Sequence, residues 1–300
     1  MIVSASYRTD IPAFYGDWFM NRLDAGFCRV ASPYGGPPYD VALAGPAVDG
    51  FVFWTKNAGP FLPVLGEVRR RGHPFVVQYT ITGYPRALEH SVTDAERAVG
   101  HVRTLAGEYG SRAVVWRYDP VLISSLTPPA WHRAAFARLA AALGGHCDEV
   151  VTSFAQIYRK TARNLDAAAR RHGFDWRDPD DADKLALLND MAVIAADNGM
   201  ALTLCSQPAL LGPGLAPSRC IDAGRLSDVA GRPLAARTKG NRPGCLCAES
   251  RDIGAYDTCP HGCAYCYAVR HRDAARCAFK GHDPSAPALA PMSARDRPAV

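Results

Sequence analysis

The chain has 300 residues, a formal net charge of +5, 48% apolar residues and 21% charged residues. This is the balance of an ordinary globular protein with enough residues for one large core or two small ones. No apolar run approaches the roughly 20 residues that span a bilayer, and the N-terminus lacks the pattern of a signal peptide. We therefore expect a cytoplasmic protein with no membrane partner. The mild positive charge gives only weak support to a nucleic-acid partner.

Short apolar segments alternate with helical patterns through the first two thirds of the chain. Strands are predicted over residues 2–6, 50–55, 74–82, 113–118, 149–154 and 201–205. Helices are predicted over residues 17–25, 61–71, 93–109 with Thr93 as N-cap, 129–143, 160–172 and 181–198. This alternation indicates βαβ units and a parallel sheet. We predict an α/β fold of the TIM-like type, as a full or partial barrel, with a doubly wound open sheet as the alternative.

The chain after the sixth predicted strand differs in composition and is rich in proline, glycine and cysteine. Residues 1–206 are predicted to form the barrel core. Residues 207–280 are predicted to form an irregular, cysteine-rich segment that binds the cluster and completes the barrel. Within it, residues 252–256 are a candidate strand and residues 267–277 a candidate helix. Residues 281–300 are predicted to be a disordered tail.

Polar side chains recur where the predicted strands end. In a barrel the chemistry lies at the carboxyl ends of the strands, because loops from every unit converge there. The alternative is that any strand must end in polar loop residues. The candidate catalytic residues at these ends are Arg8, Asp10, Lys56, Arg117 and Asp119. Other polar residues at strand ends are Asn57, Gln78, Thr82, Ser153, Gln156 and Cys205.

The sharpest motif is Cys259-Pro-His-Gly-Cys263-Ala-Tyr-Cys266-Tyr. Clustered cysteines in a reducing compartment indicate metal binding more than disulfides. Three thiolates on one loop can bind three irons of a [4Fe–4S] cluster and leave the fourth iron open. Gly262 allows the tight loop, and Tyr265 can shield one side of the cluster. The alternative is a zinc site in which His261 or a distant cysteine is the fourth ligand.

This stretch resembles the Cys-x-x-x-Cys-x-aromatic-Cys signature of the radical S-adenosylmethionine superfamily, which Cys259, Cys263, Tyr265 and Cys266 match position by position. The resemblance implies a cluster whose open iron binds S-adenosylmethionine, and reductive cleavage to a 5′-deoxyadenosyl radical. It also implies a reductant such as a flavodoxin or ferredoxin, and a full or partial TIM-like barrel. The superfamily's Gly-Gly-Glu-like segment has no clear copy here. Residues 80–83 are a candidate, and Thr82 there and Tyr265 in the motif are the predicted cofactor-binding residues. Alternatively, Lys56, Arg117 or Asp119 could hold the carboxylate, amino or ribose groups of S-adenosylmethionine.

The motif lies near the C-terminus, whereas superfamily members carry it after an early strand. This arrangement resembles a bacterial family of unknown function with a radical-SAM-like cysteine cluster at its C-terminus. Residues 4–12, 54–57 and 117–120 also resemble that family. Because a barrel is cyclic, its units can be permuted when the termini are neighbours. We therefore predict that the strand before the motif lies beside the strand at residues 2–6.

A second set of cysteines lies outside the motif. Cys205, Cys220, Cys245 and Cys247 make a complete ligand set, predicted to bind a second iron–sulfur cluster or zinc. The alternative is a set of buried or scattered thiols. The remaining cysteines, Cys28, Cys147 and Cys277, show no such grouping.

The sequence leaves three functions open. The first is a radical enzyme with an unknown substrate; Tyr267, which follows the last motif cysteine, gives a short likeness to spore photoproduct lyase and related DNA-repair proteins. The second is an electron-transfer or redox-sensing protein with fully ligated clusters. The third is a binding module with a structural zinc site and no redox activity.

Overall fold

The computed structural model describes residues 1–32 and 36–290, and its centre is one eight-stranded parallel sheet. The strand order is β12-β1-β4-β5-β6-β8-β10-β11, so neighbours in the sheet follow one another along the chain except at β12. The strands are β1 (Ile2–Ala5), β4 (Gly50–Thr55), β5 (Phe75–Thr80), β6 (Val114–Val121), β8 (Glu149–Phe154), β10 (Ala201–Leu204), β11 (Ala216–Pro217) and β12 (Ser250–Asp252).

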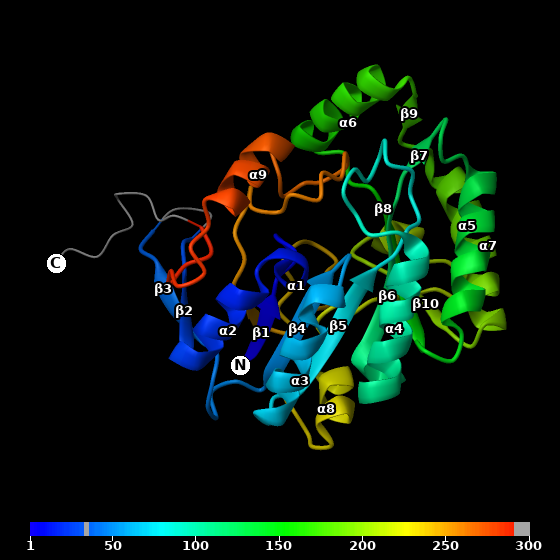
Figure 1. Ribbon diagram of the computed structural model, residues 1–300. Helices are drawn as coiled ribbons and strands as arrows, with labels where there is room; N and C mark the ends of the chain where they lie inside the picture. Colours follow the sequence, from blue (N-terminus) through cyan, green and yellow to red (C-terminus); the bar gives the residue numbers. More distant parts are fainter. Residues whose placement is uncertain (33–35, 291–300) are drawn as a thin grey trace.

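The strand order never reverses direction, which excludes the doubly wound alternative. Right-handed crossovers between successive parallel strands then place the connecting helices on one face of the sheet. We call this the outer face. The helices on it are α2 (Gly16–Ala25), α3 (Leu62–Arg70), α4 (Ala95–Tyr109), α5 (Pro129–Leu143) and α7 (Asp181–Asp197), as Figure 1 shows.

Alternate side chains of each strand belong to two separate apolar clusters. On β4, Phe51 and Phe53 pack in the large cluster under the helices, and Val52 faces the other way. The second cluster contains one aliphatic residue from each of five neighbouring strands and belongs to the inner face. These residues are Ile2, Val52, Val76, Val115 and Val151. The inner face is covered by residues 218–248, which include α8 (Ala223–Ala230).

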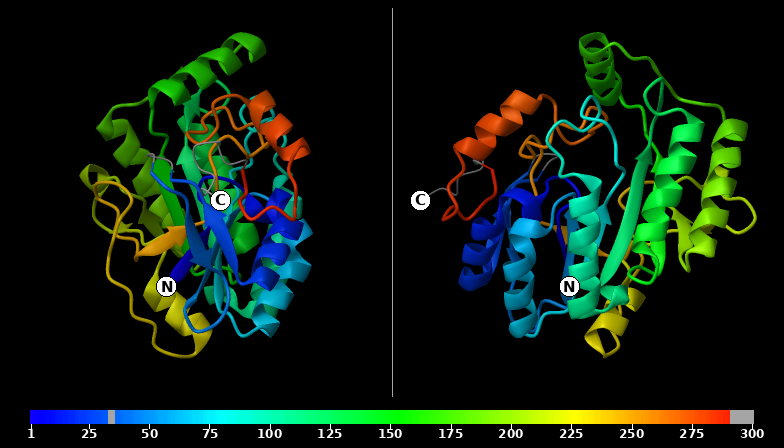
Figure 2. Two further views of the ribbon diagram at one scale, coloured as in Figure 1. Left: turned by 90° about the vertical axis from the view of Figure 1, so that its left-hand side faces the viewer. Right: turned by 45° about the vertical axis from the view of Figure 1, so that its right-hand side comes forward.

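Strand β12 returns to the start of the chain and pairs with β1, with Ile2 opposite Ser250 and Ser4 opposite Asp252. Figure 2 shows the two strands side by side. The prediction that the strand before the cysteine motif lies beside residues 2–6 is therefore confirmed. The strand itself is shorter than predicted and earlier in the chain, ending at Asp252 instead of continuing to Tyr256.

The sheet is open in the part of the chain that the structure describes, with β11 and β12 as its edges, so a closed TIM barrel is not formed. Two antiparallel pairs lie outside it: β2 (Phe27–Val30) with β3 (Tyr39–Ala42), and β7 (Ile123–Ser124) with β9 (Trp176–Arg177). The remaining helices are α1 (Ile11–Phe14), α6 (Arg159–His172) and α9 (Arg272–Lys280).

Three local predictions differ from the structure. The N-cap of α4 is Asp94, not Thr93, because the Asp94 side chain accepts a hydrogen bond from the Arg97 amide. The last helix begins at Arg272, five residues later than predicted. Residues 281–290, assigned to the tail, pack against α2, where the Trp18 indole donates to the Ala286 carbonyl at 3.0 Å; residues 291–300 lie outside the described residues.

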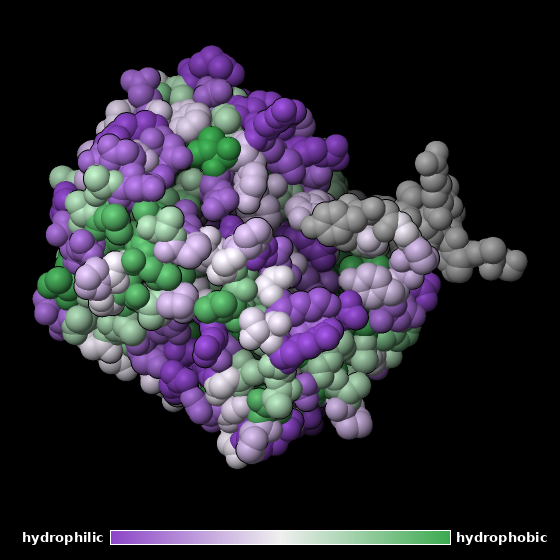
Figure 3. Space-filling view, turned by 180° about the vertical axis from the view of Figure 1, so that it is seen from behind, coloured by the Kyte–Doolittle hydropathy of each residue, from purple (hydrophilic) through white to green (hydrophobic). Residues whose placement is uncertain are grey.

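Within residues 1–32 and 36–290, no helix is both long and apolar enough to cross a membrane. Viewed from behind, the surface mixes hydrophilic and hydrophobic residues, and its upper part is mainly hydrophilic (Figure 3).

Candidate functional site

The loop between β12 and α9 carries Cys259, Cys263 and Cys266. Gly262 has φ +75°, a left-handed conformation that favours glycine and allows the chain to turn inside the motif, as predicted. The loop is held against residues 84–92: the Ala264 amide donates to the Leu88 carbonyl at 2.9 Å, and the Ser91 amide donates to the His261 carbonyl at 2.9 Å. The three cysteines are thus fixed by backbone contacts across the sheet's carboxyl edge.

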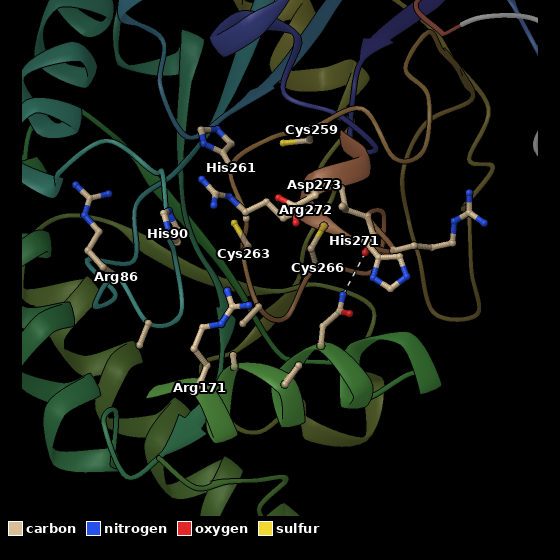
Figure 4. A pocket seen from close by; sticks show the side chains of 18 of the residues that line it. Arg86, His90, Arg171, Cys259, His261, Cys263, Cys266, His271, Arg272 and Asp273 are labelled. Carbon is tan, nitrogen blue, oxygen red and sulfur yellow. Dashed lines mark hydrogen bonds between the residues drawn. The ribbon is translucent and has the colours of Figure 1, made fainter. Parts of the chain in front are cut away.

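The three motif thiols line one cavity of about 270 Å³ between this loop, α6 and residues 86–90. Figure 4 shows their side chains around a common space. Among the residues that the structure describes, no hydrogen bond joins any two of these three thiols. Half of the lining residues besides the cysteines are basic: Arg86, His90, Arg171, His172, His261, Arg270, His271 and Arg272.

Burial raises the pKa of all three thiols, to about 12 for Cys259. Backbone amides nevertheless point at two of the sulfurs. The amides of His261 and Asp10 donate to Cys259, and those of Ala268 and Val269 donate to Cys266. Amide donors stabilise a thiolate, the form that binds metal. Across the described ranges, no three His, Cys, Asp or Glu side chains are already arranged to hold a single metal ion.

A buried carboxylate joins three of the predicted residues beside Cys263. Glu89 accepts hydrogen bonds from Lys56 at 2.8 Å, from Thr82 at 2.9 Å and from the Tyr265 hydroxyl, all at Oε1. Burial would raise the pKa of Glu89, but the Lys56 ammonium and these hydrogen bonds lower it below its ordinary value. Glu89 and Lys56 also line a second cavity of about 180 Å³.

The predicted residues Arg8 and Asp10 connect the first strand to the cysteine loop. The Arg8 guanidinium pairs with Asp252 at 2.9 Å, and both side chains are buried. Asp10 accepts hydrogen bonds from the Lys56 amide at 2.7 Å and from His261 Nε2 at 2.7 Å. These contacts hold the cysteine loop on the sheet.

Arg117 and Asp119 form an ion pair at the second set of cysteines. Arg117 Nη1 donates to Cys220 Sγ at 3.0 Å, and the guanidinium lies 5.1 Å from the centroid of the Trp54 ring. Ser153 donates to Asp119 at 2.5 Å. The predicted catalytic set is therefore divided among three places: the Glu89 centre, the anchor at β1 and the second cysteines.

Comparison with family models matches residues 2–268 to a family described as a domain of unknown function, DUF1848. The chain belongs to the DUF1848 family. No curated protein matches it. Because the DUF1848 match extends from β1 to beyond Cys266, the sheet, the cysteine loop and the second set of cysteines all lie within the family domain.

Two buried acids of this domain, Glu89 and Asp252, are absent from the sequence-based site. Glu89 lies in a loop, and two of its three partners, Lys56 and Tyr265, are far away along the chain. Asp252 falls in the predicted last strand, where its charge could have marked it: a charged residue in a strand buried against a neighbour needs partners.

Proposed function

We propose that the DUF1848 chain binds a [4Fe–4S] cluster through Cys259, Cys263 and Cys266 and acts as a radical S-adenosylmethionine enzyme. The observation that carries the proposal is the convergence of these three half-buried thiols on one cavity, at the carboxyl end of a strand that pairs with β1. The same pairing supports a partial TIM-like barrel with permuted units.

The residues present fit such a cluster. Each cysteine of a four-iron cluster binds a different iron, so the thiols face a shared space without touching one another. The motif thiols line one cavity and share no hydrogen-bond contact within the described chain. The amides aimed at Cys259 and Cys266 supply the hydrogen bonds to sulfur that tune such centres.

When bound, the cluster would supply the electron that cleaves S-adenosylmethionine to methionine and a 5′-deoxyadenosyl radical. The chain's own residues bind and orient the methionine end. Glu89 receives its three donors at Oε1, which leaves Oε2 for the amino group. Lys56 has donors beyond the one it gives to Glu89, and these suit the carboxylate. Glu89 would thus take the part of the missing Gly-Gly-Glu segment.

The electron-transfer alternative has less support, because it needs a fourth ligand. His261, the nearest candidate, uses both ring nitrogens: Nε2 contacts Asp10 at 2.7 Å and Nδ1 contacts the Ser91 carbonyl at 3.3 Å. The same contacts count against His261 as a zinc ligand. The basic lining of the cavity suits a small acidic electron carrier of the flavodoxin or ferredoxin kind.

The test is iron and sulfide content after anaerobic reconstitution, followed by addition of S-adenosylmethionine and dithionite. We expect 5′-deoxyadenosine from the native chain and none from Cys263→Ala. The control is Cys277→Ala, which removes an exposed thiol of α9 outside the motif. Zinc in place of iron at the motif, or a full cluster that never cleaves S-adenosylmethionine with any reductant, would reject the proposal.

A further inference from the structure

The second cysteine group, defined as Cys205, Cys220, Cys245 and Cys247, brings together thiols from the end of β10 and from both ends of the segment on the inner face. The Cys220 and Cys205 sulfurs lie 3.6 Å apart. Cys220 also interacts with Cys247, and Cys247 with Cys245. The four thiols therefore form a row in which Cys205 and Cys220 are the pair at contact distance.

We propose that the second cysteine group is a tetrahedral site for one zinc ion, independent of the iron–sulfur proposal. Zinc–thiolate bonds of about 2.3 Å place tetrahedral sulfurs roughly 3.8 Å apart. The 3.6 Å between Cys205 and Cys220 matches that spacing. The motif thiols differ, because they surround a cavity without contact. The two cysteine sets therefore fit different metal centres.

The hydrogen bonds to these sulfurs supply the charge that a tetrathiolate zinc site needs. Four thiolates and one Zn²⁺ carry a net charge of −2, once the thiol protons have left. Arg117 donates to Cys220 Sγ at 3.0 Å, and Arg242 Nη2 donates to Cys205 Sγ at 3.3 Å. Arg117 also pairs with Asp119, and deprotonation of the thiols would turn both guanidinium–sulfur contacts into charge-assisted hydrogen bonds.

The backbone adds a further donor and a tight loop. The Ile221 amide donates to Cys247 Sγ at 3.4 Å. Gly240 packs so closely on the loop that a Cβ there would lie 2.2 Å from the Cys245 carbonyl oxygen. This loop holds Cys245 and Cys247 as a pair on one side of the site.

Metal binding requires the row of sulfurs to close into a shell. The row is open as described, in keeping with the lack of any preformed three-ligand group among the described residues. Its end members are Cys205 and Cys245, and Cys245 is only partly buried. In the proposed site these two side chains would turn about their Cα–Cβ bonds toward the middle pair.

The proposed zinc site would stabilise a segment that has little regular secondary structure of its own. Residues 218–248 connect the two edge strands across the inner face, and α8 is their one helix of eight residues. At their ends the Ala248 amide donates to the Ile221 carbonyl at 2.8 Å. A zinc ion would fasten this junction to β10, because metal binding energy becomes folding energy where no stable apo site exists.

The test is metal content by mass spectrometry in full-length protein purified without air. We expect one zinc per chain in the native protein and also in the triple variant Cys259→Ser, Cys263→Ser, Cys266→Ser, which removes only the proposed iron site. We expect the zinc to be lost in Cys220→Ser. The matched control is Cys147→Ser, a buried cysteine outside both groups, which should keep its zinc.

A second measurement avoids dependence on folding of the variants. In the native protein, alkylation of Cys205, Cys220, Cys245 and Cys247 should be at least 10-fold slower before a zinc chelator is added than after, and Cys277 should react equally in both states. Iron and sulfide retained by the triple variant would overturn the zinc assignment in favour of a second cluster. A metal-free native protein with freely alkylated thiols, or a disulfide within the group, would overturn the site altogether.

Discussion

Asp252 provides a direct test of how the cysteine loop is attached to the sheet. It lies at the end of β12, and its carboxylate is 7% exposed. Its donors, at 2.6 to 3.1 Å, are Ser4 Oγ, Ser6 Oγ, the Tyr7 amide, Arg8 Nε and the Gly254 amide. Removing the carboxylate leaves the 6%-exposed Arg8 unpaired, and an uncompensated buried charge costs about 3–5 kcal/mol.

We therefore expect Asp252→Ala to lower the free energy of unfolding by about 3–5 kcal/mol, measured by urea titration of the reduced protein. Asp252→Asn also leaves Arg8 without a counter-charge but keeps the shape and one acceptor oxygen, so its cost should lie at the lower end of this range, about 3 kcal/mol. The control is Asp273→Asn, an exposed carboxylate 3.6 Å from Arg276, which should change stability by less than about 0.5 kcal/mol. A loss below about 1 kcal/mol in Asp252→Ala would refute the anchoring argument.

Three further predictions follow from buried groups. Burial lowers the pKa of His132 from 6.5 to about 4, so between these pH values the unfolded chain binds the proton more readily than the folded chain. The free energy of unfolding should therefore fall by about 3 kcal/mol as pH falls through this range. Urea midpoints measured against pH should show this slope, and His132→Gln should flatten it. Gly254→Ala puts a Cβ 2.1 Å from Ser6 Oγ and should cost about 1–3 kcal/mol by thermal unfolding, while Gly100→Ala on an open helix surface should be neutral or stabilising. Glu89→Gln should weaken S-adenosylmethionine binding on the order of 10- to 100-fold in equilibrium dialysis; unchanged affinity would remove Glu89 from the binding site.

The sequence predicted best the elements that are determined locally. The strands at residues 50–55 and 149–154 and the helix at 129–143 have the predicted bounds. Each is a long apolar or amphipathic run with clear ends, and the helix starts at Pro129, a residue suited to a first turn. The alternation of such elements was enough to predict a parallel sheet.

The less successful predictions concern elements that depend on distant partners. Strand β12 has three residues, and its position follows from pairing with β1 rather than from its own pattern. The last helix begins late because the residues before it are held otherwise: the Ala268 carbonyl accepts from the Asp257 amide, and the Arg270 amide donates to Asp257 at 2.5 Å. No local pattern encodes these contacts.

The candidate site likewise has one part that local sequence predicts and another that depends on distant residues. The motif cysteines are three to four residues apart, so their convergence could be read from spacing. The Glu89 centre could not, because Glu89 is 33 residues from Lys56 and 176 from Tyr265. The polar strand ends were predicted as one set, and their division among three places depends on the side-chain direction at each strand.

The topology makes the position of the motif cysteines depend on the chain that crosses the inner face. Strand β12 has one neighbour in the sheet, and it is reached only after residues 218–248 have passed from the β11 edge to the β1 edge. The second cysteine group lies on this crossing, and Asp252 lies at its end. The loop of Cys259 is therefore positioned by two buried polar junctions in sequence, first the thiol row and then the Arg8–Asp252 pair. A three-residue edge strand has few ladder hydrogen bonds of its own, so these junctions act together with the contacts between the loop and residues 84–92 to hold the loop in place.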